Sequence, residues 1–314
     1  AAFVSVVTSR YTNAALSFDR MFREDDFMVR LPPFELWLKL GMLLAALLLP
    51  LPAWAQTQLP CGQLVTASIA VTGEEDRYAF NGAPGDEIVL RVRSTTDNFN
   101  ARMWFYDPAG AVVQSSKTDI KETLSGTGVY AVVVKYSSGT VRTGDYGLFR
   151  QNLKSPCQAV PLSCGTVQSR KLAHPAKIDT YTYTAAANDA IRLQVFRNTA
   201  GLALEMELYL PNGLLWERDT GSIISTRLPN AGLYTLFIYT NNIITDGEYR
   251  LGFQKAKGAC NATPLVACQT LRTSIGQQAE MDAYTFDSPG SGVSSTSGAA
   301  TSNGTRRRDS NSWR

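Results

Sequence analysis

Residues 76–92 are DRYAFNGAPGDEIVLRV and residues 179–195 are DTYTYTAAANDAIRLQV, so the chain repeats itself after 103 positions. In both copies apolar residues alternate with polar ones after the central turn. That is the period-two pattern of a β-strand with one buried face. Gly85 in the first turn is replaced by Asn188 in the second. Glycine and asparagine best tolerate positive φ, so we expect the turn to keep its geometry.

The repeat continues on both sides of this stretch. A strand that runs into a Pro-x-Gly turn occurs at residues 103–110 and 206–213, and a closing strand occurs at 144–148 and 247–251. A third copy of the first strand follows at residues 282–286. Each full unit contains seven or eight short strands separated by turn residues, and no helical stretch. This pattern predicts an all-β chain of tandem β-sandwich, jelly-roll-like modules.

The repeat divides the chain after residue 58 into segments. Residues 288–314 are rich in Ser, Gly, Thr, Asn and Arg without alternation, which predicts a tail without strands. The short segment 158–163 contains a proline and is expected to be a semi-rigid linker. The predicted segments are β-sandwich repeat 1 at 59–157, β-sandwich repeat 2 at 162–260, a truncated start of repeat 3 at 266–287, and a disordered low-complexity tail at 288–314.

The N-terminal part has the features of an export signal. A basic flank precedes an almost wholly apolar run at 41–51, and the tripeptide AWA at 53–55 supplies a small-x-small cleavage pattern. We expect a signal peptide at 28–55, a mature chain that starts at Gln56, and non-structural upstream sequence at 1–27. The alternative is an uncleaved membrane anchor, but the apolar run is shorter than the roughly 20 residues a span needs. The predicted location is therefore extracellular or in the cell envelope, without a membrane span after cleavage.

Charge and composition exclude several functional classes. The formal net charge is only +3 and the basic residues are scattered, which is unlike a nucleic-acid-binding surface. His174 is the single histidine, so two-histidine metal sites are excluded and a catalytic nucleophile would have one candidate base. No nucleophile elbow or triad is visible. We therefore expect no enzyme activity and no cofactor.

Five cysteines in an exported chain are expected to form disulfides. The spans from Cys61 to Cys157 and from Cys164 to Cys260 have equal length, which suggests one bond closing each unit. The competing scheme pairs Cys157 with Cys164 and Cys260 with Cys268, leaving Cys61 unpaired. Spacing alone does not decide between the two. We favour bonds within units, because Cys268 is then unpaired for the same reason that the third unit is incomplete.

In its order of features the chain resembles the bacterial pre-peptidase C-terminal domain, a β-sandwich appended to secreted proteases and strung in tandem in other exported proteins. The resemblance implies an accessory, non-catalytic module that serves secretion, substrate attachment or surface interaction. It transfers no catalytic residues to this chain. The matching features are the Asp-x-Tyr-x-Phe strand at 76–80, Pro-Gly-Asp with an alternating strand at 84–92, the Asp-Pro-x-Gly turn within 105–110, Gly-x-Tyr at 128–130, and the closing strand at 144–148.

An aromatic pair is the first candidate for a ligand contact. Trp104 and Tyr106 alternate with Met103 and Phe105, so they face outward if the latter two face the core. An outward pair can stack on a sugar ring or bind an apolar partner, and the alternative is packing between modules. Tyr209 takes the position of Tyr106 in the second unit.

Two aspartates and a histidine are the other candidates. Asp76 and Asp179 recur at one place in the repeat, and their oxygens could ligate calcium. The alternative is a turn aspartate that accepts backbone N–H bonds. His174 precedes Pro175 and is predicted to be a solvated loop residue.

Together these observations predict a secreted, non-catalytic and monomeric accessory protein. It would bind an extracellular polysaccharide or protein partner through exposed strand faces and loops. One alternative is the N-terminal fragment of a larger hydrolase, a peptidase or glycosidase, whose catalytic domain is missing. Another is a purely structural envelope spacer.

Overall fold

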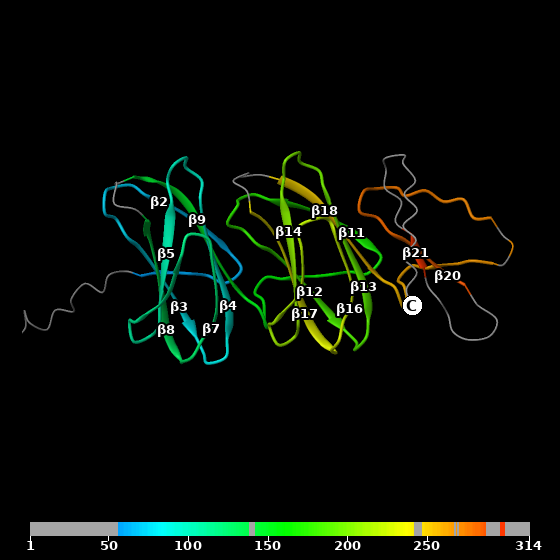
Figure 1. Ribbon diagram of the computed structural model, residues 1–314, viewed down its shortest axis with the longest axis horizontal. Coiled ribbons are helices and arrows are strands. Elements are labelled where there is room, and N and C mark those ends of the chain that lie inside the picture. The colour runs from blue at the N-terminus through cyan, green and yellow to red at the C-terminus, as the bar shows by residue number, and fades with distance from the viewer. Residues whose placement is uncertain are drawn as a thin grey trace, which may run out of the picture. The chain divides into compact units, whose positions relative to one another are not determined.

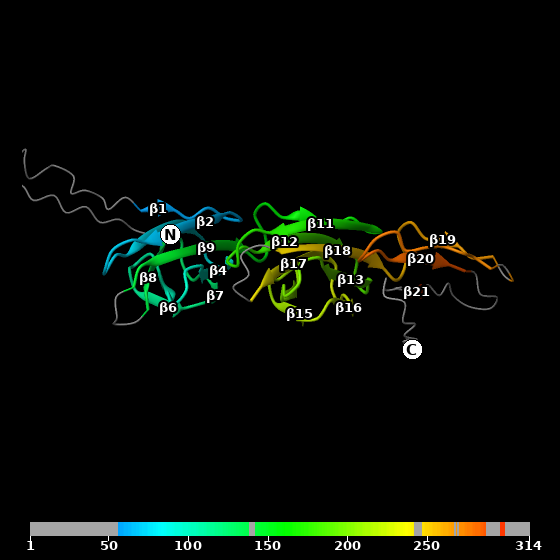
Figure 2. The same ribbon diagram turned by 90° about the horizontal axis from the view of Figure 1, so that it is seen from above.

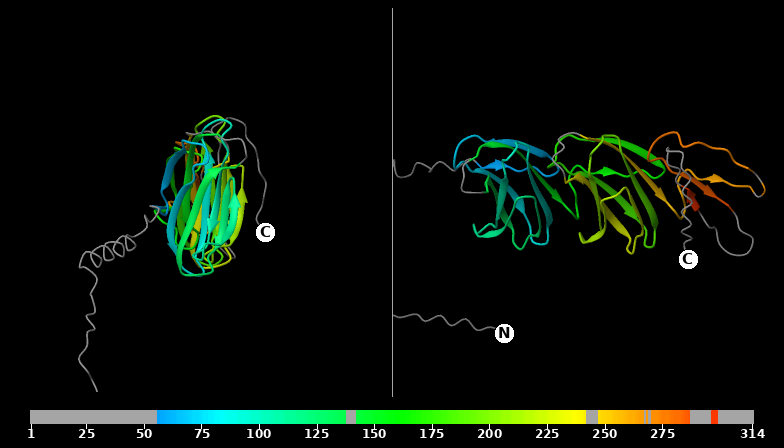
Figure 3. Two further views of the ribbon diagram at one scale, coloured as in Figure 1. Left: turned by 90° about the vertical axis from the view of Figure 1, so that its left-hand side faces the viewer. Right: turned by 45° about the horizontal axis from the view of Figure 1, so that its top comes forward.

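The computed structural model describes residues 56–137, 142–241, 247–266, 268 and 270–286, and the backbone of 296–298. All regular structure in these residues is β, and no helix occurs among them (Figure 3). Within the same residues no helix is long and apolar enough to cross a bilayer. The fold class is therefore all-β, as predicted. The predicted upstream segment at 1–27 and the predicted signal peptide at 28–55 lie outside the described residues.

The first module consists of two facing sheets (Figure 1). We call the five-stranded sheet, with the order β1-β3-β8-β5-β6, the front sheet, and the four-stranded sheet, β2-β9-β4-β7, the back sheet. Only β1 and β3 pair in parallel among these strands. The strands are β1 (Thr57–Gln58), β2 (Leu64–Ile69), β3 (Asp76–Gly82), β4 (Glu87–Ser94), β5 (Ala101–Tyr106), β6 (Val112–Ser116), β7 (Asp119–Thr123), β8 (Gly128–Tyr136) and β9 (Gly144–Asn152).

The second module repeats this topology strand for strand. Its front sheet has the order β10-β12-β17-β14-β15, and its back sheet has the order β11-β18-β13-β16. Tyr78 pairs with Val132 in the first front sheet, and Tyr181 pairs with Leu236 at the matching place in the second. The strands are β10 (Val160–Pro161), β11 (Thr166–Leu172), β12 (Asp179–Ala185), β13 (Ala190–Arg197), β14 (Leu204–Tyr209), β15 (Leu215–Asp219), β16 (Ile223–Arg227), β17 (Gly232–Thr240) and β18 (Gly247–Lys255).

Each module has its own apolar core between its two sheets, because the inward residues of the alternating strands meet there. On β5 the inward side chains Ala101, Met103 and Phe105 are buried, while Trp104 and Tyr106 between them are partly exposed. The outward orientation predicted for that aromatic pair is therefore confirmed. The turn prediction also holds, because Gly85 has φ 83° and Asn188 has φ 66°.

Each module has nine strands, more than the seven or eight that alternation predicts. The additional strands β1 and β10 have two residues each, too short to show a period. The segment 158–163, predicted to be a semi-rigid linker, contributes a strand to a sheet. Val160 and Pro161 form β10, which pairs in parallel with β12, so this connection belongs to the front sheet of the second module.

A third, smaller sheet follows the second module (Figure 2). It contains β19 (Thr263–Pro264), β20 (Asp282–Thr285) and β21 (Thr296–Gly298). β19 is parallel to β20 and β21 is antiparallel to it, so the three strands repeat the arrangement of β1, β3 and β8.

The expectation of no strand after residue 288 is wrong at β21. The outer edge of β20 offers backbone groups that a polar segment can satisfy by pairing, and threonine suits a strand. The remainder of the predicted tail at 288–314 lies outside the described residues.

Disulfides close the two modules at equivalent places. Cys61 is bonded to Cys157 and Cys164 to Cys260, each with a sequence separation of 96, whereas Cys268 is free and exposed. This is the pairing within units. A buried glutamine fixes each closing cysteine, because Gln151 Oε1 accepts from the backbone N–H of Cys157 at 2.8 Å and Gln254 Oε1 accepts from that of Cys260 at 3.1 Å.

Replacing both cysteines of the first bond, Cys61→Ser with Cys157→Ser, should lower the free energy of unfolding by about 2–5 kcal/mol, because the unfolded chain regains the freedom of a long loop. Urea unfolding followed by far-UV circular dichroism measures the loss. Cys268→Ser is the control and should change stability by less than about 0.5 kcal/mol. Equal losses in the two proteins would contradict the assigned role of the bond.

Candidate functional site

The outward faces of the sheets, rather than a cleft, carry the features that bear on function. The back sheet of the first module packs against the front sheet of the second through an apolar cluster separate from both module cores. Because its members point away from their own cores, they are buried only where the modules meet. The first module contributes Val89, Phe149, Leu153 and the partly buried Leu64, and the second contributes Ile178, Tyr209, Phe237 and Tyr239.

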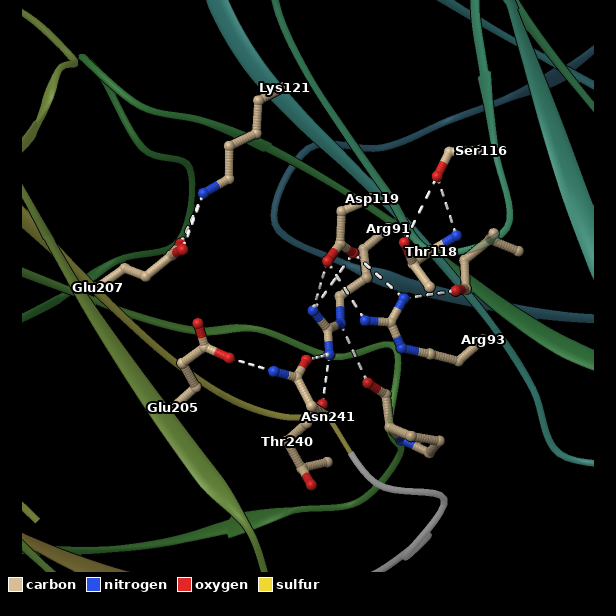
Figure 4. A network of polar contacts seen from close by, with 12 residues as sticks. Arg91, Arg93, Ser116, Thr118, Asp119, Lys121, Glu205, Glu207, Thr240 and Asn241 are labelled. Atoms are coloured by element: carbon tan, nitrogen blue, oxygen red, sulfur yellow. Dashed lines mark hydrogen bonds and ion pairs between the residues drawn. The ribbon is translucent and has the colours of Figure 1, made fainter. Parts of the chain in front are cut away.

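A buried arginine crosses this interface beside the apolar cluster (Figure 4). The side chain of Arg91 on β4 is 1% exposed. Its Nε donates to the carbonyl of Pro175 at 3.2 Å, and its guanidinium also donates to the carbonyl of Thr240, both in the second module. The guanidinium carbon lies 4.2 Å from the centroid of the Tyr239 ring. Within its own module Arg91 pairs with Asp119 at 3.1 Å.

A buried glutamate makes the reciprocal contact (Figure 4). Glu207 on β14 is 1% exposed and pairs with Lys121 of β7 at 2.9 Å. It also pairs with Arg218 and accepts a hydrogen bond from the hydroxyl of Tyr209. Each module therefore buries a charge that is satisfied partly by the other module.

The ionisation of these two groups follows from their surroundings. Burial and, to a smaller extent, the neighbouring Arg93 lower the pKa of Arg91 to about 10, so the group is still protonated at neutral pH. Burial alone would raise the pKa of Glu207, but the hydrogen bond from Tyr209 and the charge of Lys121 outweigh it and place the pKa below its usual value. Both groups are charged in the folded protein near neutrality.

His174 belongs to the same interface, so the prediction of a solvated loop histidine is wrong. It is 9% exposed, and a Cβ added at Gly147 of the first module would lie 2.2 Å from its Cε1 atom. Its Nδ1 accepts from the backbone N–H of Ala176 at 3.0 Å. Burial lowers its pKa, and a proton on Nδ1 would also face that N–H donor. The loop before Pro175 is covered because it packs on β9.

Tyr209, proposed as a ligand contact, is also buried, with 1% of its surface exposed. Lys121 of the first module covers its ring at 5.1 Å from the centroid. This position is therefore used for packing between modules, the alternative that the sequence left open. One sequence signal does point to such burial: the nearly continuous apolar run from Leu233 to Tyr239 is typical of a strand covered on both faces.

The equivalent face of the first module differs, because Arg102, Trp104 and Lys135 are partly exposed and their ion-pair and ring contacts stay within that module. We call it the Trp104 face, after the partly exposed side chain at its centre. Trp104 is paired across the sheet with Val133, and its ring lies 4.6 Å from Lys135 Nζ and 5.7 Å from the guanidinium carbon of Arg102. The Trp104 face consists of Glu75, Arg77, Arg102, Trp104, Tyr106, Val133 and Lys135.

The recurring aspartates have a structural role that neither sequence hypothesis anticipated. The Tyr146 hydroxyl donates to Asp76, and the Tyr249 hydroxyl donates to Asp179 at 2.7 Å. These tyrosines extend the network, because the Tyr78 and Tyr146 hydroxyls lie 2.6 Å apart.

The aspartates thus accept from tyrosines instead of from backbone N–H groups. Among the described residues, no group of three or more His, Cys, Asp or Glu is placed to hold a metal ion, so the calcium hypothesis gains no support.

Comparisons with known proteins give the following. No protein-family model matches the sequence, and no curated protein matches it. A pre-peptidase C-terminal domain of a collagenase from Bacillus anthracis is 21% identical, with a TM-score of 0.28, over 32% of this chain and 98% of its own. PliG from Aeromonas hydrophila, a periplasmic inhibitor of g-type lysozyme, is 13% identical, with a TM-score of 0.27, over 31% and 95%. The CUB1-EGF-CUB2 domains of rat MASP-1 are 10% identical, with a TM-score of 0.22, over 63% and 99%. These likenesses carry no argument about function.

Arg91→Met should lower the free energy of unfolding by about 2–4 kcal/mol, because the carbonyls of Pro175 and Thr240 lose a buried donor. Urea unfolding measures the loss. Arg93→Met is the matched control, since Arg93 shares Asp119 but donates its hydrogen bonds within the first module. It should cost about 1 kcal/mol or less. Equal losses would show that Arg91 acts through Asp119 alone.

Acid should weaken the folded state through His174. Because folding lowers its pKa, its contribution is complete above its unfolded pKa of about 6.5 and is lost as pH falls toward the folded value. Urea midpoints measured between pH 7.5 and 5 should fall more steeply for the natural protein than for His174→Gln. Parallel curves for the two proteins would refute the assignment, since all other titrating groups are shared.

Proposed function

We propose that the chain is an exported, non-catalytic accessory protein built from tandem modules like the pre-peptidase C-terminal domain. It binds an extracellular polymer or protein partner through the Trp104 face. The resemblance of its motifs to that family supports the module type. The two intramolecular disulfides and the signal-like segment at 28–55 support export.

One observation carries the proposal: the same outward face recurs as a docking surface along the chain. In the second module this face packs on the first module through Ile178 and its neighbours. At the next repeat Met281 takes the place of Ile178, and its Cε atom lies 3.3 Å from a Cβ built on Gly252 of β18. The first copy of the face is the one left open among the described residues, and it presents Trp104.

A structural spacer is the second candidate, and the buried interface favours it. Arg91 and Glu207 join neighbouring modules through buried charges, and such contacts hold modules in a fixed relation. A spacer predicts no saturable binding, whereas an accessory module predicts binding that depends on Trp104.

Trp104→Ala should weaken binding by the full-length chain at least tenfold, because it removes the apolar surface at the centre of the face. The test is a binding isotherm on immobilised polysaccharides and matrix proteins, with circular dichroism to confirm folding. Trp216→Ala is the matched control, since Trp216 is 39% exposed on β15 of the second module. Absence of saturable binding to every surface would support the spacer, and equal loss in both variants would exclude the Trp104 face.

A further inference from the structure

We infer that the partner of the Trp104 face is an acidic polysaccharide, an inference that rests on the proposed function and names its ligand class. The face contains three cations, Arg77, Arg102 and Lys135, and one carboxylate, Glu75. Glu75 pairs with Lys135 at 2.5 Å and with Arg77 at 2.8 Å, so one carboxylate is shared by two cations. An excess of positive charge is left on the sheet surface.

Arg102 is the cation without a charged partner. It makes no ion pair with any described residue, and its Nε is buried without a hydrogen-bond partner among them. Its position between β8 and β6 holds the guanidinium beside the Trp104 ring. An arginine in this state offers donors in a fork that matches a carboxylate or sulfate group.

The remaining acidic residues close to the face are already engaged. The Glu74 carboxylate accepts from the backbone N–H groups of Ala70 and Val71, at 2.5 and 3.0 Å. Asp76 accepts from the Tyr146 hydroxyl, and burial raises its pKa. Neither residue is hydrogen-bonded to Arg102, so they do not cancel its charge at short range.

The second module shows what this face looks like when its partner is another β-sandwich. Arg102 pairs with Lys135 across the sheet, and Glu205 pairs with Tyr239 at the matching place in the second module, so Arg102 corresponds to Glu205. In the same way Trp104 pairs with Val133 and Glu207 pairs with Phe237, so Trp104 corresponds to Glu207. The protein-binding version is thus apolar with acidic residues. In the first module Arg102 replaces one of these carboxylates and Lys135 replaces Tyr239, whereas Trp104 takes the place of the other carboxylate. Glu75 likewise stands where the second module has the buried Ile178.

This replacement excludes a second copy of the first module's back sheet as the occupant. That sheet presents Arg91 and Lys121 to its partner, and these cations would meet Arg102 and Lys135. Like charges at such an interface cost several kcal/mol. An occupant of opposite charge is required.

A hydrated polyanion suits the face better than an acidic protein. Protein interfaces are depleted of lysine and glutamate, and here Lys135 and Glu75 form an ion pair on the face. Trp104 is partly exposed beside these charges, and the flat ring of a tryptophan can lie against the C–H face of a sugar while neighbouring cations bind its acid groups. Both kinds of contact are available within one face.

The test uses the full-length chain and four soluble probes: polygalacturonate and alginate as acidic glycans, dextran as a neutral glycan, and polyglutamate as an acidic polypeptide. Isothermal titration at low and high salt gives the affinities. We expect the two acidic glycans to bind at least tenfold more tightly than dextran and polyglutamate, with binding weakened by salt. Arg102→Gln and Lys135→Gln should each weaken it at least threefold, whereas Lys257→Gln, an exposed cation of the second module, should leave it unchanged.

The outcomes separate this inference from the proposed function. Trp104-dependent binding to dextran alone would overturn the acidic ligand and leave the binding module intact. Equal binding to polyglutamate would overturn the assignment to a glycan. Acidic-glycan binding that Arg102→Gln and Lys135→Gln leave unchanged would overturn the site. Binding by Trp104→Ala that is lost at high salt would support both glycan stacking and ion pairing. The charge variants must retain folded circular dichroism spectra for this result to count.

Discussion

The structure depends on two charges that are buried where the modules meet. Arg91 of the first module donates to carbonyls of the second, and Glu207 of the second accepts hydrogen bonds from the ammonium group of Lys121 of the first. A buried ion without a partner is costly, so a shifted contact that kept either group buried away from its partners would be penalised. The apolar cluster around Phe149 and Phe237 supplies contact area. The charges supply orientation, because hydrogen bonds to fixed carbonyls tolerate little rotation.

The two modules are alike inside and different outside, and this contrast follows from what covers each face. Inward positions keep their type, as at Met103 and Met206, because both lie in a closed apolar core. The residue type at outward positions depends on what packs against that face of the module. Gln151 and Gln254 keep the same bonds to a closing cysteine, yet only Gln151 is seen to donate to the next module, at Thr180 Oγ1. A residue can thus retain a structural role within its module and gain a second role at the interface.

Sequence periodicity predicts the part of the structure that local physics controls. Alternation around residues 76–92 and 179–195 is sufficient for the strands, their buried faces and the turn at Gly85, because each depends on neighbours in the chain. The interface is beyond this reasoning, since His174 and Tyr209 are covered by residues distant in sequence. β21 is missed for a related reason: pairing with the edge of β20 determines it, and its own composition does not. Among the candidate residues, only those on the first front sheet keep the exposure that alternation predicts.

The location of the open face also limits how such a protein can bind. Tandem repetition often raises avidity, because each copy adds a site to the same chain. Here the front sheet of the second module packs against the first module, so it is not available to a ligand. At the third copy of this face Met281 lies against Gly252 of the second module. Adding modules in this manner would extend the protein without adding a copy of the Trp104 face. Affinity must then come from the chemistry of a single face. A stacking ring beside a guanidinium that has no ion pair among the described residues provides more specific chemistry than the apolar face that joins one module to the next.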